Sequence, residues 1–459
     1  MAAVMKHSPR TVIVGLGKTG LSCARFLAAR HIPVAVTDTR AAPPGLAQLQ
    51  QELPDVAVFL NGFSAELLNH AEQVVVSPGV SVRDPVISAA AARGVPVIGD
   101  IELFAHEARA PVVAITGSNG KSTVTTLLGA MAQRAGRSTR VGGNLGTPAL
   151  DLLHEQQPDL YVLELSSFQL ETTHSLNAAA AVVLNVTPDH MDRYADVAEY
   201  TAAKQRAYRG DGVMVINADD ALVRAMANPA RTIVRFTLAE PQGGDFGVRM
   251  VQGEPWLAHG TQALLPAREL HIKGSHNIAN ALAALALGQV MQLPMTDMLA
   301  TLREFPGLPH RSQWVGEHGG VEWYNDSKGT NVGATLAALQ GLAQTNPTGA
   351  IILIAGGDGK GADFSALRPA VAAHARAVVL LGRDAPIIEQ ALNKAVPIVR
   401  ATDMHDAVHL AGRLARPGDK VLLSPACASF DMYSGYEERG QVFTAAVQQY
   451  IDSAQGQGT

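Results

Sequence analysis

Short runs of β-branched and aliphatic residues alternate with longer stretches of helical apolar spacing along almost the whole chain. Strands that alternate with helices are typical of parallel sheets with crossover helices, so the pattern predicts an α/β fold. A chain of 459 residues is also too long for one ordinary hydrophobic core. The runs fall into three blocks, which predict domains at residues 1–105, 106–305 and 306–459.

The first block predicts a Rossmann-like domain built on a parallel sheet. Its expected strands are Thr11–Val14, Pro33–Thr37, Ala57–Phe59, Gln73–Ser77 and Val95–Ile98. A proline-containing segment near Ala108–Pro111 ends this block, because proline interrupts regular structure.

The second block predicts a mostly parallel sheet followed by a small antiparallel one. The parallel strands are expected at Val112–Thr116, Arg140–Val141, Leu160–Leu165, Ala180–Val186 and Gly212–Asn217. Glycine-rich turns join the runs expected to be antiparallel, which are Thr232–Phe236, Gly247–Val251, Trp256–His259 and Ala263–Leu265. A helix from Asn277 to Met291 follows, and Phe305-Pro-Gly-Leu-Pro309 predicts a boundary.

The third block repeats the α/β pattern and predicts a second Rossmann-like domain. Its strands are expected at Ala350–Ala355, Ala377–Leu381, Ile398–Ala401 and Lys420–Ser424, with a final helix at Gly440–Ile451.

Composition narrows the possible partners and location. The net charge is −5 and no long run of Lys or Arg occurs, so nucleic acid is not an expected partner. The uncharged stretch from Ser275 to Thr296 is rich in Ala and interrupted by His, Asn and Gln, which favours a buried helix over a membrane span. Cys23 and Cys427 form no disulfide or metal pattern. With no apolar signal core in Met1–Arg10, a soluble cytoplasmic protein is expected.

The strongest chemical signal is Thr116-Gly-Ser-Asn-Gly-Lys-Ser-Thr123, which lies between a predicted strand and a predicted helix. Backbone N–H groups of such a turn and the helix N-terminus together form an anion site. Lys121 can reach the outer phosphates of a nucleotide, and Ser122 can ligate Mg²⁺. The usual phosphate loop has a glycine where this chain has Ile115, so the motif is shorter than usual.

A second glycine turn, Gly15-Leu-Gly-Lys-Thr-Gly20, follows the first strand, and Asp38 ends the next one. This spacing matches the dinucleotide fingerprint and by itself suggests an NAD-linked oxidoreductase. The same N–H donors suit any diphosphate, including that of a UDP-sugar.

Polar groups follow several other strands, where the chemistry of parallel sheets gathers. Glu164 could bind Mg²⁺, and His190 could bind a metal or an oxyanion, although either could equally brace a loop. Lys328 and Lys360 lie in glycine-containing loops that could hold a phosphoryl group or a carboxylate, or could be simple turns. Cys427 has no basic partner in the sequence and is expected to pack rather than react. Most helix lysines are solvated, and the spacing of Lys204 predicts nothing different.

The chain resembles the Mur ligases over essentially its whole length. The resemblance rests on the two glycine turns and on further motifs: Ser77-Pro-Gly79, Gly142-Gly-Asn-Leu-Gly146, Glu164-Leu-Ser-Ser-Phe-Gln-Leu170, Asp189-His-Met-Asp192, Gly274-Ser-His-Asn277, Pro309-His-Arg311, Asn325-Asp-Ser-Lys328 and Leu423-Ser-Pro-Ala-Cys-Ala-Ser429. It implies a UDP-binding domain, a P-loop ATPase-like central domain and a C-terminal domain for the acceptor amino acid. It also explains the short phosphate loop, in which Ser118 stands where these ligases commonly have Thr.

The resemblance further implies an ATP-dependent amide ligase that uses Mg²⁺, with two ions expected, and acts as a monomer. Its small-molecule substrates would be UDP-N-acetylmuramoyl-L-alanine and D-glutamate, joined through an acyl phosphate. The residues implied for ATP are Gly117, Ser118, Asn119, Gly120, Lys121, Ser122, Thr123, Asn277, Asn280, Arg311 and Asp326. Those implied for the UDP-substrate are Lys18, Thr19, Asp38, Thr39, Arg40, Gly79 and Asn144.

The residues implied for D-glutamate are Lys328, Thr330, Lys360, Ser429, Phe430 and Tyr436. The implied metal site consists of Ser122, Glu164, His190 and Lys204, the last matching a lysine that the family carbamylates. The catalytic set is then Lys121, Glu164, His190, Lys204, Lys328 and Lys360. Lys18 and Tyr436 depart from the side chains that other members carry.

Three alternatives to this interpretation remain open. They are an NAD-linked oxidoreductase with an accessory ATP domain, a related amide ligase with another acceptor, and a non-catalytic ATP-binding switch. The N-terminal diphosphate turn weighs against the second, and the number of lysines and carboxylates weighs against the third.

Overall fold

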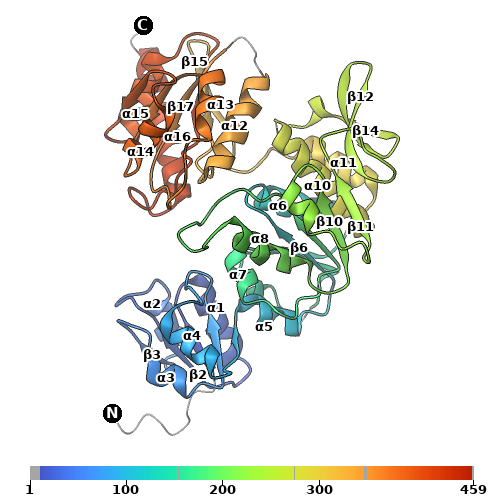
Figure 1. The fold of residues 1–459 in the computed structure, drawn as a ribbon, viewed down its shortest axis with the longest axis vertical. Helices are drawn as coiled ribbons and strands as arrows, with labels where there is room; N and C mark the ends of the chain where they lie inside the picture. Colours follow the sequence, from blue (N-terminus) through green and yellow to red (C-terminus); the bar gives the residue numbers. More distant parts are fainter. Residues whose placement is uncertain (1–10, 154–155, 273, 346–348, 457–459) are drawn as a thin grey trace.

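The computed structural model describes residues 11–153, 156–272, 274–345 and 349–456, and it has three α/β units, each built on its own sheet (Figure 1). Met1–Arg10, where the sequence predicts no signal core, lies outside the described residues. The prediction of an α/β fold is confirmed.

The N-terminal sheet has the strand order β3-β2-β1-β4-β5, and all its pairs are parallel. Its strands are β1 (Thr11–Val14), β2 (Val34–Thr37), β3 (Ala57–Phe59), β4 (Gln73–Val76) and β5 (Val97–Ile98). The helices are α1 (Lys18–Ala28), α2 (Leu46–Glu52), α3 (Ala65–Asn69), α4 (Pro85–Ala92) and α5 (Asp100–Glu107). The central position of β1 confirms the Rossmann-like prediction and places the first glycine turn at the edge where such sheets bind ligands.

The central sheet has the order β14-β13-β12-β11-β10-β9-β6-β8-β7. Its strands are β6 (Val112–Thr116), β7 (Thr139–Gly143), β8 (Leu160–Glu164), β9 (Ala180–Val183), β10 (Val213–Asn217), β11 (Ile233–Phe236), β12 (Phe246–Val251), β13 (Glu254–His259) and β14 (Gln262–Pro266). Strands β12 to β14 pair antiparallel, as predicted, but they extend the parallel sheet rather than form a separate one.

The prediction that Thr232–Phe236 is an antiparallel strand was wrong. Strand β11 runs parallel to β10 and to β12. Helix α9 (Ala221–Ala225) connects β10 to β11 as a crossover, and a crossover returns the chain in the same direction.

The remaining central elements cover this sheet. They are α6 (Lys121–Arg134), η1 (Ala149–Leu152), α7 (Ser167–Glu171), α8 (Val197–Gln205), η2 (Arg206–Tyr208), η3 (Ala267–Glu269), α10 (Ser275–Val290) and α11 (Met295–Glu304). Most of the uncharged stretch forms α10, and the residues of this helix from Ala281 to Leu287 are fully buried. The prediction of a buried helix is therefore confirmed. Within the described ranges, no helix has both the length and the apolar character that a membrane crossing needs.

The C-terminal sheet has the order β15-β16-β20-β17-β18-β19, with only β15 antiparallel to its neighbour. Its strands are β15 (Gln313–His318), β16 (Val321–Asn325), β17 (Ile351–Ala355), β18 (Ala375–Leu380), β19 (Ile398–Arg400) and β20 (Lys420–Leu423). The helices are α12 (Val332–Thr345), α13 (Leu367–His374), α14 (Ala385–Leu392), α15 (Met404–Leu414) and α16 (Tyr436–Gly456). The hairpin of β15 and β16 adds strands that the sequence patterns did not mark.

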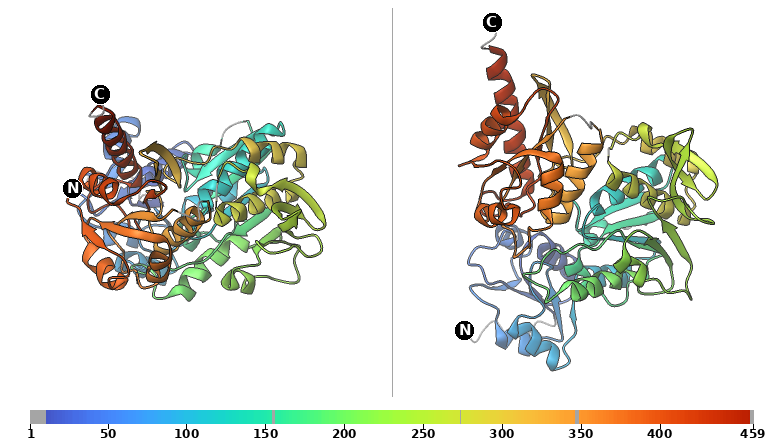
Figure 2. Two further views of the ribbon diagram at one scale, coloured as in Figure 1. Left: turned by 90° about the horizontal axis from the view of Figure 1, so that it is seen from above. Right: turned by 45° about the horizontal axis from the view of Figure 1, so that its top comes forward.

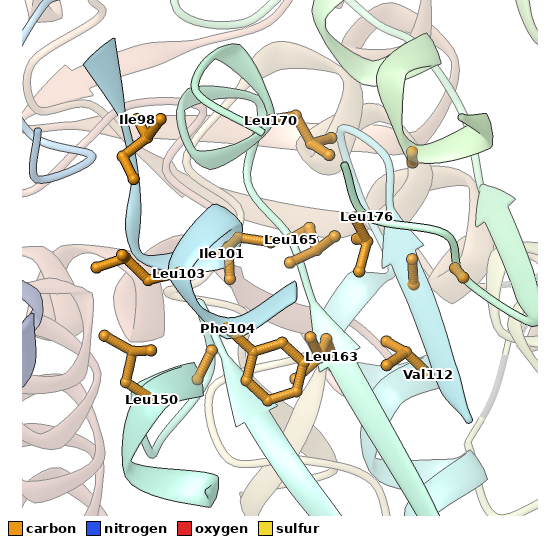
Figure 3. Close-up of a cluster of buried hydrophobic side chains, with 14 of the residues drawn as sticks. Ile98, Ile101, Leu103, Phe104, Val112, Leu150, Leu163, Leu165, Leu170 and Leu176 are labelled. Atoms are coloured by element: carbon orange, nitrogen blue, oxygen red, sulfur yellow. The ribbon is translucent and has the colours of Figure 1, made fainter. Parts of the chain in front are cut away.

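The hydrophobic cores show how firmly the units are joined. One cluster runs from Ile13 and Val36 in the N-terminal sheet through α5 to Leu163 and Met214 in the central sheet. Figure 3 shows its middle, where Phe104 of α5 packs beside Leu163 and Val112. The two C-terminal clusters contain only residues of that unit. Figure 2 shows the C-terminal unit beside the other two, and polar contacts such as that of Lys360 with Asp189 join it to the central unit.

Candidate active site

The phosphate loop lies between β6 and α6, as predicted. Gly117 and Gly120 have φ of +148° and +85°, conformations that side chains rarely adopt. A Cβ on Gly120 would stand 2.3 Å from Asn280 Oδ1, so this turn needs glycine for space as well. Lys121 Nζ donates to the carbonyl oxygens of Gly117 and Ser118, both at 2.9 Å. The loop thus holds the Lys121 ammonium against its own carbonyl oxygens.

The strand order β9-β6-β8 places other predicted residues on both sides of this loop. Glu164 ends β8, and the segment that contains His190 follows β9. The carboxyl ends of parallel strands share one edge, so these side chains meet the phosphate loop there.

Glu164 has the features of a cation ligand. It is 3% exposed, and its Oε1 accepts a hydrogen bond from Asn144 Nδ2 at 2.7 Å. Its Oε2 is buried, with no hydrogen-bond partner among the described residues. A buried carboxylate oxygen without a partner is costly, and a cation would satisfy it. No group of three His, Cys, Asp or Glu side chains with metal-site geometry occurs in the described ranges. Mg²⁺ suits such a place, because it commonly keeps water and phosphate ligands.

Lys204 contradicts the expectation of a solvated helix lysine. It is 1% exposed, its Nζ donates to the Gly117 carbonyl at 2.9 Å, and it lies 4.3 Å from the centre of the Tyr200 ring. Burial, and next the neighbouring Lys121, lower the pKa of Lys204 well below its ordinary value. Helical spacing could not reveal this, because the burial comes from the phosphate loop that folds over α8.

His190 and Asp189 line the same cavity as Lys204. His190 packs edge-on against Phe168 with ring centres 4.7 Å apart, and burial lowers its pKa to about 4. Asp189 Oδ1 accepts from Lys360 Nζ at 2.5 Å, and Asp189 Oδ2 accepts from Asn331 Nδ2 at 3.0 Å. These contacts join the central unit to the C-terminal one.

Asp189 and Asn331 are site residues that the sequence predictions omitted. Asp189 directly precedes His190 at a strand end, a position that could have marked it. Asn331 bonds Asn119 of the phosphate loop, and that pairing across 212 positions left no local signal.

Arg311 and Asp326 border the phosphate loop from the C-terminal side. Arg311 Nη2 donates to Ser122 Oγ at 2.8 Å. Asp326 accepts from Ser424 Oγ at 2.7 Å and from Ser312 N at 3.0 Å. Burial raises the pKa of Asp326 to about 6.

Lys328 lies over the face of Tyr436, with Nζ 3.6 Å from the ring centre. Burial, and next the nearby Arg311, lower the pKa of Lys328 to about 8. Cys427 is fully buried, and burial raises the pKa of its thiol to about 12, which fits the expectation that it packs.

Three cavities gather the predicted residues in three sets. One of 490 Å³ is lined by every residue of the predicted catalytic and D-glutamate sets, namely Lys121, Glu164, His190, Lys204, Lys328, Thr330, Lys360, Ser429, Phe430 and Tyr436. A smaller one of 120 Å³ adjoins it and is lined by Asn119, Gly120, Thr123, Asn277, Asn280, Arg311 and Asp326. A third of 490 Å³ in the N-terminal unit is lined by Lys18, Thr19, Asp38, Thr39, Arg40, Gly79 and Asn144. Gly117 lines none of these three cavities. Its carbonyl oxygen accepts hydrogen bonds from the ammonium groups of Lys121 and Lys204.

Asp38 has partners within the chain itself. Its carboxylate accepts from the Leu16 N–H at 2.7 Å and from the Arg40 side chain at 2.7 and 2.9 Å. Burial raises its pKa, but the bonds from Arg40 and the backbone outweigh this and lower the pKa to about 2. Asp38 therefore fixes the glycine turn and holds the half-exposed Arg40 side chain beside it.

Family models match all three units. Residues 9–99 match the Mur ligase MurD-like N-terminal domain, residues 115–288 the Mur ligase middle domain, and residues 310–427 the Mur ligase glutamate ligase domain. The UDP-N-acetylmuramoylalanine–D-glutamate ligase of Nitrosococcus oceani is 58% identical over 441 residues, 96% of this chain and 97% of that protein. The protein of that name from Pseudomonas aeruginosa is 55% identical over 95% of this chain and 97% of its own.

Solved structures agree on the fold. The UDP-N-acetylmuramate–alanine ligase MurC from Thermotoga maritima matches with a TM-score of 0.61 at 18% identity, over 96% of this chain and 99% of that one. The MurF ligase from the same organism, solved with ADP, matches with a TM-score of 0.60 at 15% identity, over 99% and 98%. The matched models together cover most of the sequence, so the chain belongs to the Mur ligase family.

Proposed function

We propose that this protein is an ATP-dependent ligase that joins D-glutamate to UDP-N-acetylmuramoyl-L-alanine in the synthesis of peptidoglycan precursors. Relatives at 53–58% identity carry the name of that ligase. The observation that carries the proposal is the cavity where the phosphate loop, Glu164 and the lysines of the C-terminal unit face one another.

The reaction has two steps. A carboxylate oxygen of the alanyl group attacks the γ-phosphorus of ATP, the bond to ADP breaks, and an acyl phosphate forms. The amine of D-glutamate then attacks the acyl carbon, loses a proton, and expels phosphate to leave the amide. Both steps bring anions together, so preorganised positive charge is the main requirement.

The chain supplies that charge from two sides. Lys121, from the phosphate loop, stabilises the negative charge of the transferring phosphoryl group. Arg311 stabilises the same charge from the C-terminal unit. Asn277, Asn280 and Asp326 hold the rest of ATP, with Gly117, Ser118, Asn119, Gly120, Ser122 and Thr123 forming the phosphate cradle.

Ser122, Glu164 and His190 would hold Mg²⁺, and we propose two ions. The partnerless Oε2 of Glu164 and a His190 ring with a pKa of about 4, and so uncharged at neutral pH, both fit this role. When bound, Mg²⁺ offsets the negative charge of the phosphates. A carbamate on Lys204 would add a carboxylate-like ligand, and its low pKa favours the neutral amine from which carbamates form.

The other substrates occupy the remaining cavities. The UDP-muramoyl group binds along Lys18, Thr19, Asp38, Thr39, Arg40 and Gly79, and reaches the reaction centre past Asn144, which lines both cavities. D-glutamate binds Lys328, Thr330, Lys360, Ser429, Phe430 and Tyr436. The three domains are proposed at 1–105, 106–305 and 306–459. All the proposed residues come from one chain, so a monomer suffices, and a cytoplasmic location gives access to ATP.

An oxidoreductase fits this chain less well. In the dinucleotide fingerprint the acidic residue after the second strand binds a ribose hydroxyl, whereas here Asp38 is bound by Leu16 and Arg40. Adding NADH and finding a saturable fluorescence change would revive that alternative.

The proposal is tested by phosphate release with UDP-N-acetylmuramoyl-L-alanine, ATP and Mg²⁺, using D-Glu, L-Glu, L-Ala and L-Lys in turn as acceptors. Turnover is expected with D-Glu alone, and Lys121→Ala is expected to abolish it. Turnover with a different acceptor would make the protein another amide ligase. Absence of acceptor-dependent phosphate release would favour a non-catalytic ATP-binding switch.

A further inference from the structure

A buried arginine underlies the loops that carry the proposed acceptor residues. Arg439, in the first turn of α16, is 2% exposed. Its Nε donates to Ser327 Oγ at 3.0 Å, and its Nη2 donates to the carbonyl oxygens of Ser327 at 2.8 Å and Cys427 at 3.1 Å. Its Nη1 donates to the Ala428 carbonyl at 3.3 Å. One guanidinium therefore joins the loop after β16 to the loop after β20.

A third loop is fixed at the same place. Asp358 pairs its backbone with Ala428 in both directions, at 3.0 and 2.8 Å. Gly357 beside it has φ of +131°, and a Cβ there would stand 2.2 Å from the Ala428 carbonyl and 3.3 Å from Arg439 Nη1. The loop after β17 thus rests against the carbonyl group that Arg439 holds.

Each loop carries a proposed acceptor residue close to its bond with this cluster. On the third loop, Lys360 lies two positions after Asp358, and its N–H donates to Asp358 Oδ1 at 3.1 Å. Ser327 directly precedes Lys328, and Ala428 directly precedes Ser429. Ser327 Oγ also donates to the Tyr436 carbonyl at 2.8 Å, and the Tyr436 ring lies under the Lys328 ammonium. A shift of any of these carbonyl groups would move a cationic or hydroxyl group that faces the cavity.

Arginine is suited to this place for a geometric reason. Its planar guanidinium has donors on three nitrogens in a fixed fork, which matches acceptors in three directions. A lysine has one nitrogen and could not reach all of them. Burial lowers the pKa of Arg439 to about 10, so the group still carries its charge at neutral pH.

We infer that Arg439 is a positioning residue that sets the relative placement of Lys328, Lys360 and Ser429, and through them the affinity for the acceptor amino acid. The inference depends on the proposed function for the identity of that acceptor. It assigns Arg439 no contact with ATP or with the UDP-substrate, because the hydrogen bonds of Arg439 go to Ser327, Cys427 and Ala428. The proposed ATP residue Asp326 precedes Ser327, but Ser424 and Ser312 hold its carboxylate separately.

The test compares three Michaelis constants in Arg439→Lys, which keeps the charge and loses the fork. The KM for D-glutamate is expected to rise about tenfold, because hydrogen bonds that position the acceptor residues are lost. The KM for ATP and the KM for the UDP-substrate are expected to stay within about twofold of wild type. Arg413→Lys is the matched control, because Arg413 is an exposed arginine of α15 in the same unit. All three constants are expected to stay unchanged in it.

Ser327→Ala is a milder second variant that removes one acceptor of the guanidinium. Of the three constants, only the KM for D-glutamate is expected to rise in this variant. In the double variant with Arg439→Lys, Ser327→Ala is expected to add less than its separate effect, because both substitutions break the same network. If Arg439→Lys does not fold, Ser327→Ala carries the test. An unchanged D-glutamate KM in the folded variants, or an equal rise of all three constants, would overturn the inference.

Wild-type activity separates this inference from the proposed function. Absence of acceptor-dependent phosphate release in the wild type refutes the function before any variant is measured. If the wild type uses another amino acid, the same comparison is made with that acceptor, and the expected selective rise is unchanged.

Discussion

The burial of one amine connects the phosphate loop to the proposed metal site. Lys204 lies under the Gly117 carbonyl with Lys121 nearby, and both burial and that second cation favour its neutral form. A neutral amine can take up CO₂ to form a carbamate, which changes the side chain from a cation to an anion. That change would turn a repulsive neighbour of Lys121 into a ligand for Mg²⁺.

Removing this amine gives a specific prediction. Lys204→Ala is expected to lower kcat about 100-fold through lost charge stabilisation, and added formate or acetate is expected to restore part of it by filling the vacated place. Lys420→Ala is the control, because Lys420 is also a buried lysine with a lowered pKa but lies in the C-terminal sheet. It is expected to show no rescue by acids. Full activity in Lys204→Ala would refute the carbamate.

Lys328 predicts a pH dependence whose sign follows from its pKa of about 8. The ammonium is charged below that pH and becomes neutral as the pH rises through it. Glutarate, a dicarboxylate without the reacting amine, is therefore expected to inhibit with a constant Ki near pH 7. Above pH 8 its Ki should rise by up to about tenfold per pH unit.

The control for this measurement is Lys328→Arg, because a guanidinium stays charged over the whole range. Its Ki for glutarate is expected to stay flat up to pH 9.5, even if its value at pH 7 differs. A flat profile in the wild type would mean that the charge of Lys328 does not hold the acceptor.

Helix α6 and the turn before it form the central structural element of the site. Gly120 combines a left-handed φ with close approach to Asn280, so an added methyl group would meet a proposed ATP residue. Gly120→Ala is expected to raise the KM for ATP at least about tenfold, since a loop displaced by even 1 Å loses phosphate contacts.

Gly136, just beyond the other end of α6, is a matched control. Its φ is +76°, and a Cβ there would meet nothing within 4 Å. Gly136→Ala is expected to lower the free energy of unfolding by about 1–2 kcal/mol through backbone strain, with KM for ATP unchanged. Equal ATP constants in the two variants would contradict the role given to Gly120, and thermal unfolding would report the strain in both.

Elements were predictable from the sequence where periodicity alone determines them. The alternation of apolar runs predicted the parallel strands and the buried helix α10. It could not give the direction of β11, because direction depends on the short crossover α9 and on pairing with distant strands. The burial of Lys204 and the contact between Asp189 and Lys360 likewise arise from tertiary packing, which local spacing does not encode. Apart from Gly117, the residues that the motifs marked line the three cavities, but the motifs did not predict the bonds between them.

The three units differ in how they are joined, and this predicts a motion. The N-terminal and central units share one apolar cluster, whereas the C-terminal unit has separate cores. It meets the central unit through polar contacts such as Lys360 with Asp189 and Arg311 with Ser122. Substrates that place anions between these cations would strengthen the contact, so the C-terminal unit is expected to close on binding.

Small-angle X-ray scattering tests this closure. The radius of gyration is expected to fall when a non-hydrolysable ATP analogue, Mg²⁺ and the UDP-substrate are added together. Calorimetry on the same samples confirms that the ligands have bound. An unchanged scattering curve at saturation would show that the unit does not move.

The central claim is that a substrate carboxylate attacks the γ-phosphate of ATP. UDP-N-acetylmuramoyl-L-alanine labelled with ¹⁸O in its alanyl carboxylate tests this most directly, with mass spectrometry of the phosphate released in the presence of D-glutamate. The account predicts that one labelled oxygen leaves in each phosphate while the other stays in the new amide. Phosphate that carries no label would contradict it.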